Sequence, residues 1–294
     1  MADPPHAGRV ARWTRRAHEL QRSAEAARTR HATLDFGFGL AERDSSIGGG
    51  LLAGALAYRL FVLLLPTALL LVSGLGIYSG SVDKSPQQVA REAGLHGLIG
   101  SEVAQTASGR ARWLVFLVMI PVVLYALTTL YRAIAKVYAI VWLGSARGVP
   151  TAPAGIGVLG AAFAVQMATG PVVHWVSGYR FGYVLAFVVY VLLIGGAWLA
   201  VSLELPHARA RWPALLPGAA LFGVGLLGVS VFNIYVTSRL VEGRANTYGA
   251  LGIATALLFS LVLVGRLIVT SAEVNVALSE RRTPPEAPRP PEPA

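Results

Sequence analysis

Six apolar windows, each long enough to cross a lipid bilayer, constrain the fold of this chain more than any other feature. A spanning helix needs roughly 20 consecutive apolar residues. The windows are Ile47–Tyr78, Trp113–Tyr131, Ala154–Val176, Tyr183–Leu203, Ala214–Val236 and Tyr248–Ala272. Because lipid offers no hydrogen bonds to an open backbone, each window must pair its own backbone groups, as a helix does. The sequence therefore predicts an all-α, polytopic membrane bundle of six transmembrane helices.

The amino-acid composition agrees with a chain that is largely surrounded by lipid. Charged residues make up 14% of the 294 residues, and hydrophobic residues make up 54%. An ordinary soluble domain carries about 25% charged residues. The chain has no cysteine, which excludes disulfides, cysteine-ligated metals and thiol catalysis.

The windows divide the chain into three parts. Residues 1–46 are polar and Arg-rich, with no apolar signal core, so we expect a retained cytoplasmic N-terminal segment. Apolar residues between Val10 and Ala24 recur at helical spacing, which predicts an amphipathic helix that lies on an anionic membrane or in solvent. Residues 47–280 form the six-span membrane domain. Residues 281–294 are Pro-rich, and we expect a disordered tail.

One connection, residues 79–112, is long enough to contain structure of its own. Ser85, Pro86 and Gln88 have the spacing of a helix start. An irregular apolar stripe follows them, and we expect one or two amphipathic helices on the extracytoplasmic side. The second window is expected to continue as a helix to Leu143.

Basic residues are distributed unequally between the two sides of the predicted bundle. With the N-terminus inside, sixteen of the 25 Lys and Arg residues lie on the inner side, seven on the outer side and two within spans. Cytoplasmic loops carry the excess of Lys and Arg. We therefore expect both termini in the cytoplasm, and the basic composition requires no nucleic-acid partner.

Three ionisable residues fall within the predicted spans. Arg59 lies in the first, and Arg266 and Glu273 lie near the inner end of the sixth, seven residues apart on one helix face. We hypothesise that Glu273 bonds Arg59, Arg266 or both. Buried bridges between helices, substrate or proton handling, and a snorkelling arginine are the alternatives.

Three further residues belong to this candidate polar region. Tyr58 adjoins Arg59, and Asn275 lies two residues after Glu273. Pro66 removes one backbone hydrogen bond from the first span and predicts a helix break there. These residues could line a polar cavity.

No arrangement of residues typical of an enzyme is present in the sequence. The six His are scattered, and there is neither a zinc-binding motif nor a phosphate-binding loop nor a serine nucleophile elbow. We expect no catalytic residue, no metal and no cofactor, and hence a protein that is not an enzyme.

Three segments of the chain resemble the YihY/BrkB family of bacterial inner-membrane proteins. The first is Ala57-Tyr58-Arg59-Leu60-Phe61, which Pro66 follows. The second is Leu205-Pro206, with Leu216-Pro217-Gly218-Ala219 after it. The third is Tyr248-Gly249-Ala250-Leu251-Gly252, with Ala272-Glu273-Val274-Asn275 at the end of the same span. Their order and spacing resemble the family over residues 51–278.

The resemblance implies a multi-pass protein of the bacterial inner membrane that is linked to envelope integrity. It implies a transporter or flippase-like handler of lipids or envelope precursors. Anionic amphiphiles fit the two arginines and one glutamate of the spans. The alternative is a non-transporting scaffold that binds envelope proteins through the connector. A remote alternative is a membrane-bound ribonuclease, since some members of the family carry a ribonuclease BN label.

Overall fold

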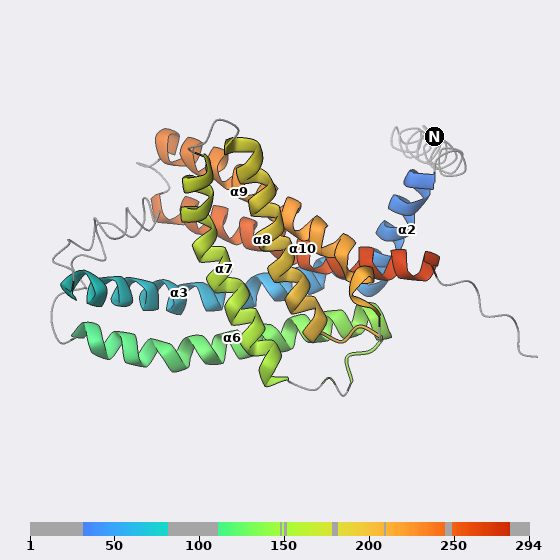
Figure 1. Cartoon of the computed structure of the whole chain (residues 1–294), viewed down its shortest axis with the longest axis horizontal. Coiled ribbons are helices and arrows are strands. Elements are labelled where there is room, and N and C mark those ends of the chain that lie inside the picture. The colour runs from blue at the N-terminus through green and yellow to red at the C-terminus, as the bar shows by residue number, and fades with distance from the viewer. Residues whose placement is uncertain are drawn as a thin grey trace, which may run out of the picture. The chain divides into compact units, whose positions relative to one another are not determined.

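The structure is a computed structural model, and it describes residues 32–81, 111–147, 149, 152–177, 182–208, 210–244 and 249–282. Within these residues the regular secondary structure is entirely helical (Figure 1). The helices are α2 Ala32–Ile47, α3 Gly49–Ser81, α6 Ala111–Leu143, α7 Pro153–Ser177, α8 Gly182–Glu204, α9 Trp212–Arg244 and α10 Gly249–Arg282. The predicted helix at residues 10–24, the connector helices and the tail from residue 283 lie outside the described residues.

The chain divides into two compact units after Ile47. Helix α2 belongs to the first unit, where Ser45 and Ser46 donate hydrogen bonds to carbonyls one turn earlier. The six long helices belong to the second unit. All six contain stretches that are long and apolar enough to cross a membrane, which confirms the predicted six-span bundle.

Local sequence explains where several of these helices begin and end. Helix α6 continues to Leu143, as predicted, and Gly144 follows in the left-handed backbone region with a φ of 68°. Its N–H donates to the Ile140 carbonyl at 3.0 Å, a frequent way to end a helix. Pro153 stands at the start of α7, where a missing N–H costs nothing. Helices α9 and α10 extend beyond their predicted windows because hydropathy detects only the part of a helix in lipid.

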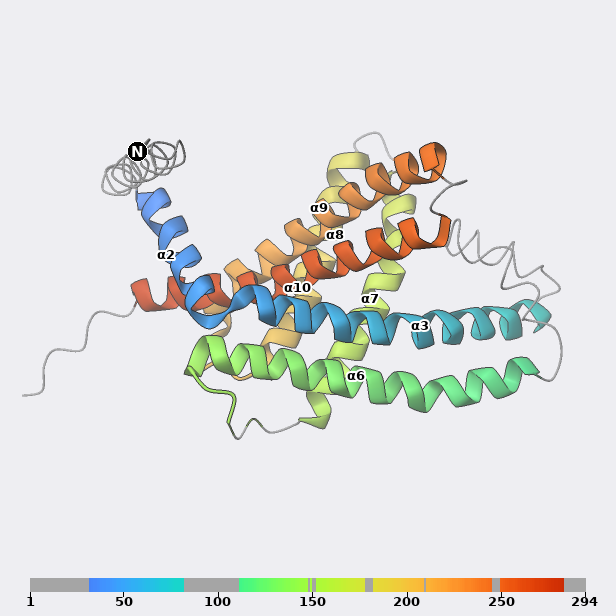
Figure 2. The ribbon, with the colours of Figure 1, turned by 180° about the vertical axis from the view of Figure 1, so that it is seen from behind.

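The six spans form a closed ring in which each helix packs against its neighbours in the chain. The pairs are α3 with α6, α6 with α7, α7 with α8, α8 with α9, α9 with α10, and α10 with α3. Helix α10 also contacts α6. Figures 1 and 2 show α3 and α6 side by side along their length, with α7 crossing them steeply.

Most residues of the spans are on the surface of the ring rather than inside it. No more than 33% of any spanning window is buried. The exposed side chains are mostly large and apolar, including Leu51, Leu65 and Leu114. A surface of this kind is suited to lipid and unsuited to water.

Helix α3 is one helical element from Gly49 to Ser81, with Pro66 inside it. A local opening or kink of the helix at Pro66 stays a prediction. Proline is tolerated in a spanning helix when nearby groups take up the backbone polar atoms that it disturbs. Beside it, the Thr67 hydroxyl donates to the Leu63 carbonyl at 2.7 Å. The side chain of Pro66 is buried against the bundle. Pro66 is therefore part of the packing of α3.

Candidate functional site

Buried polar side chains from three helices meet near the end of the bundle where α6 and α8 finish. Tyr138 of α6 shares a hydrogen bond of 3.1 Å with the Ser202 hydroxyl of α8. Trp198 of α8 donates from Nε1 to the Ser271 hydroxyl of α10 at 3.2 Å. All four side chains are buried. These bonds connect helices far apart in the sequence inside an apolar bundle.

A fourth helix joins this cluster through a side chain that bonds to a backbone. The N–H of Gly218 in α9 donates to Oδ1 of Asn275 in α10 at 2.7 Å. A Cβ at position 218 would overlap the Ser271 carbonyl and the Asn275 amide, so only glycine allows this approach. We call Tyr138, Trp198, Ser202, Gly218, Ser271 and Asn275 the polar junction.

The polar junction brings together two of the segments that carry the family resemblance. Leu216-Pro217-Gly218-Ala219 begins the fifth span, and Ala272-Glu273-Val274-Asn275 lies near the end of the sixth. The Gly218–Asn275 bond joins them across 57 residues. Hydrogen bonds between helices inside a membrane contribute about 0.6 kcal/mol to stability on average. The arrangement therefore holds α9 and α10 in register.

The acidic residue of the candidate region lies beside the polar junction. Glu273 is 1% exposed, and Asn275 is fully buried. Arg266 is half-buried on the same helix. Both Arg266 and Glu273 take part in interactions within the protein. A bond between Arg266 and Glu273 stays a prediction.

The structure does not bring Arg59 and Glu273 together. Helices α3 and α10 run antiparallel, and a Cβ on Gly265 would overlap the carbonyl of Ala53. From this contact, Arg59 lies six residues toward one end and Glu273 eight residues toward the other. At 1.5 Å per residue, the two residues are about 21 Å apart along the helix axes.

Arg59 and Tyr58 both lie on the surface of α3. Tyr58 is 62% exposed, and Arg59 is exposed as well. Arg59 forms no hydrogen bond or ion pair in the part of the chain that the structure describes. Because the surface of a span faces lipid, neither residue lines the interior of this bundle.

The polar junction includes residues that the sequence did not single out. Tyr138, Trp198 and Ser202 lie in strongly apolar stretches, and their partners are 64 to 73 residues away. Single serines and aromatic residues are too common in spans to signal such contacts. Gly218 and Asn275 stood within the motifs, but nothing in the motifs showed that they touch.

The six apolar helices, the lipid-suited surface and the buried interhelical ties define a polytopic α-helical membrane protein. A family model, Virulence factor BrkB, matches residues 42–294. The chain therefore belongs to the Virulence factor BrkB family, which confirms the resemblance noted in the motifs. No curated protein and no solved structure matched the chain.

Proposed function

We propose that this chain is a non-enzymatic, transporter-like protein of the bacterial inner membrane that handles anionic amphiphiles. The substrate class comprises membrane lipids and lipid-linked envelope precursors. The role is one of maintaining the cell envelope, with both termini in the cytoplasm. Membrane lipids are the expected partners.

The exposed guanidinium of Arg59 in an apolar span is the observation that carries this proposal. Helix α3 has no acidic residue in its 33 residues, and Arg59 lies ten residues from its beginning. A cation near the middle of a span costs roughly 2.5–3.5 kcal/mol on insertion scales. A salt bridge to a neighbouring helix would reduce this insertion cost, because it pairs the charge of Arg59. An exposed Arg59 is available instead to a negatively charged headgroup from the membrane.

The proposed orientation of the chain in the membrane follows the distribution of basic residues. The connections α6–α7 and α8–α9 carry basic residues and lie at the same end of the bundle as the start of α3. Cytoplasmic connections are the basic ones. In this orientation Arg59 belongs to the cytoplasmic half of its span.

A complementation experiment tests the proposal. A strain that lacks this protein receives the wild-type chain, Arg59→Leu or Arg147→Leu, and envelope permeability and lipid distribution are measured. Arg147 is the matched control because it is exposed in the α6–α7 connection outside the spans. We expect Arg59→Leu to be inserted at the wild-type level and to fail to restore the envelope, and Arg147→Leu to restore it. Full restoration by well-expressed Arg59→Leu would contradict the proposal.

A further inference from the structure

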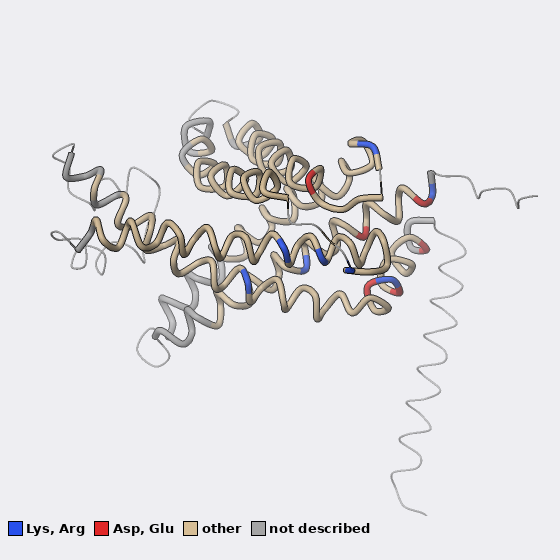
Figure 3. Tube along the Cα trace, turned by 90° about the horizontal axis from the view of Figure 1, so that it is seen from below, with Lys and Arg blue, Asp and Glu red and all other residues tan. Residues whose placement is uncertain are grey.

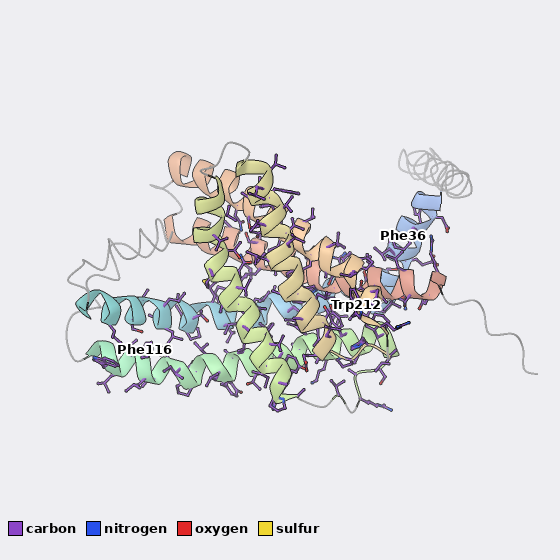
Figure 4. All side chains as sticks on the ribbon, viewed as in Figure 1. Phe36, Phe116 and Trp212 are labelled. Carbon is purple, nitrogen blue, oxygen red and sulfur yellow. The ribbon has the colours of Figure 1, made fainter. Side chains whose placement is uncertain are left out.

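The outer half of α6, away from the polar junction, is enclosed much less than its inner half. Among the described side chains of α6, every buried one lies between Ala126 and Val141, and those from Trp113 to Tyr125 are exposed or half-buried. In this outer half α6 lies against α3, where a Cβ on Gly74 would be 3.3 Å from the Phe116 ring. Figure 4 labels Phe116 near the start of α6. The two helices thus form a hairpin whose outer half stands partly uncovered.

One face of α6 changes from buried to exposed along its length. Residues seven apart lie within about 20° of each other around a helix. Tyr131 is 1% exposed and lies against α7, because a Cβ on Gly155 would overlap its ring. Leu124, seven residues further out, is 54% exposed, and Leu117 beyond it is exposed as well. The face of α6 that meets α7 in the inner half is therefore open in the outer half.

Helices α3 and α10 show the same change on the faces by which they touch. Their close contact lies in the inner half, where a Cβ on Gly265 would overlap the Ala53 carbonyl. Leu258, seven residues further out than Gly265 on α10, is 48% exposed. Leu64 lies about 20° around α3 from Ala53 and is also exposed. Figures 1 and 2 show α3 and α10 drawing apart toward the outer end of α3.

The open faces belong to one side of the α3–α6 hairpin. A Cβ on Gly160 of α7 would lie 3.2 Å from Leu127, and Met167, seven residues further out, is exposed. Tyr138 of the polar junction lies seven residues inward of Tyr131, so this face of α6 is directed toward α8 and α10 as well as α7. The outer groove is our name for the space lined by Leu64, Leu117, Leu124, Met167 and Leu258.

The chemistry of the outer groove is that of hydrocarbon. All five lining side chains are large and apolar. No Lys, Arg, Asp or Glu lies between residues 60 and 81 of α3 or between residues 113 and 131 of α6. Figure 3 shows the described charges along the middle of the bundle and toward its other end. Exposed apolar surface of this kind is suited to an apolar ligand.

The length of the outer groove matches one lipid chain. Leu127 is buried at the middle of the 33-residue helix α6 and closes the inner end of the groove. The ten residues from Leu127 out to Leu117 span about 15 Å. Half of the hydrocarbon core of a bilayer is also about 15 Å thick, and this is the depth that the chains of one leaflet occupy.

We infer that the outer groove binds an acyl chain of a membrane lipid, with the end of the chain toward Leu127 and the headgroup beyond Leu117. The groove is continuous with the lipid-facing surface of α3 and α6, so a chain can enter from the bilayer. This site goes beyond the proposed function, because Leu64 lies about 140° around α3 from Arg59. In the proposed orientation the lipid belongs to the extracytoplasmic leaflet.

Electron paramagnetic resonance tests what fills the outer groove. The chain has no cysteine, so a nitroxide can be attached to Leu124→Cys, to Leu258→Cys and to Leu192→Cys on the exposed face of α8 as the matched control. Each variant is reconstituted in phosphatidylcholine vesicles, and collisions with oxygen, which dissolves in lipid, are compared with collisions with a water-soluble nickel chelate. We expect frequent oxygen collisions and rare nickel collisions at all three positions.

Two results of this measurement would overturn the inference. Frequent nickel collisions at Leu124→Cys and Leu258→Cys would show that water fills the groove. Rare collisions with both reagents would show that a segment of protein, either from this chain or from a second copy, covers it.

A photoreactive lipid distinguishes a bound chain from the surrounding bilayer. The full chain is reconstituted with phosphatidylcholine that carries a diazirine at the end of one acyl chain, and mass spectrometry locates the crosslinked residues. We expect crosslinks on α10 around Leu258. Leu124→Trp should fill the groove from the facing helix and remove them. Leu192→Trp adds the same side chain to the exposed face of α8 and should leave them unchanged.

Met167→Trp fills the groove from a third helix and provides a second variant if Leu124→Trp does not fold. The inference would be overturned by an absence of crosslinks around Leu258 in the wild-type chain, or by crosslinks that survive a folded groove-filling variant. Crosslinks that depend on the groove, together with an intact envelope in the Arg59→Leu strain, would contradict the proposed function and leave this site standing. Failed complementation without crosslinks would do the reverse.

Discussion

Adding one methyl group at position 218 should weaken the bundle through the polar junction. In Gly218→Ala the new Cβ would overlap the Ser271 carbonyl, which belongs to a backbone and cannot swing aside. Overpacking of this kind costs about 1–3 kcal/mol. Displacing Asn275 would also lose its hydrogen bond with the Gly218 N–H, worth about 0.6 kcal/mol. Alanine recovers about 0.5–1 kcal/mol in a helix, so we expect a net loss of about 2 kcal/mol.

Thermal unfolding of the purified chain in detergent measures this loss. A change of 1 kcal/mol shifts Tm by roughly 2–4 °C in proteins of 150–250 residues, so Gly218→Ala should lower Tm by roughly 4–8 °C. Gly228→Ala is the matched control, because it lies in the same helix and its Cβ would meet nothing within 4 Å. That variant should be neutral or slightly stabilising. Equal Tm values for the two variants would show that α9 and α10 do not approach as described.

Two further predictions concern the junction and the orientation. Trp198→Phe should lose about 1 kcal/mol in the same unfolding assay, because it loses the bond to Ser271 but keeps a ring that can stack on Phe222. Trp198→Ala should lose about 3–5 kcal/mol. An unchanged stability of Trp198→Phe would contradict the bond to Ser271. The chain has no cysteine, so an impermeant maleimide should label Ser177→Cys in intact cells and Ser145→Cys only after permeabilisation. Labelling of Ser145→Cys in intact cells would reverse the orientation.

Hydropathy predicted the number and order of the spans because the property is local. Each window, such as Ala154–Val176, excludes water along its own length, and a lipid-spanning segment has few alternatives to a helix. The end of α6 at Leu143 was also predictable, since the sequence continues at helical spacing until Gly144.

Pro66 shows what local reasoning leaves open. A proline weakens a helix in isolation, but α3 packs against α6 and α10. The sequence of the first window does not show which helices pack against it around the proline.

The predicted cluster of Arg59 and Glu273 illustrates a second limit. Sequence spacing places a residue along a helix but leaves undetermined how neighbouring helices slide and rotate against each other. The close approach at Gly265 and Ala53 sets that slide and separates the two residues. A pairing of Arg59 with Glu273 would need a different register between α3 and α10, and the sequence does not specify that register.

What could be read directly from the amino acids is that this chain crosses a membrane six times as helices and resembles the family to which it belongs. Those properties depend on the composition of contiguous stretches and on short motifs. Only the folded bundle shows that Gly218 touches Asn275, that Trp198 reaches Ser271 and that Arg59 is exposed on the surface of α3. Such contacts depend on the rotation and register of whole helices, which are set by packing between residues distant in the chain.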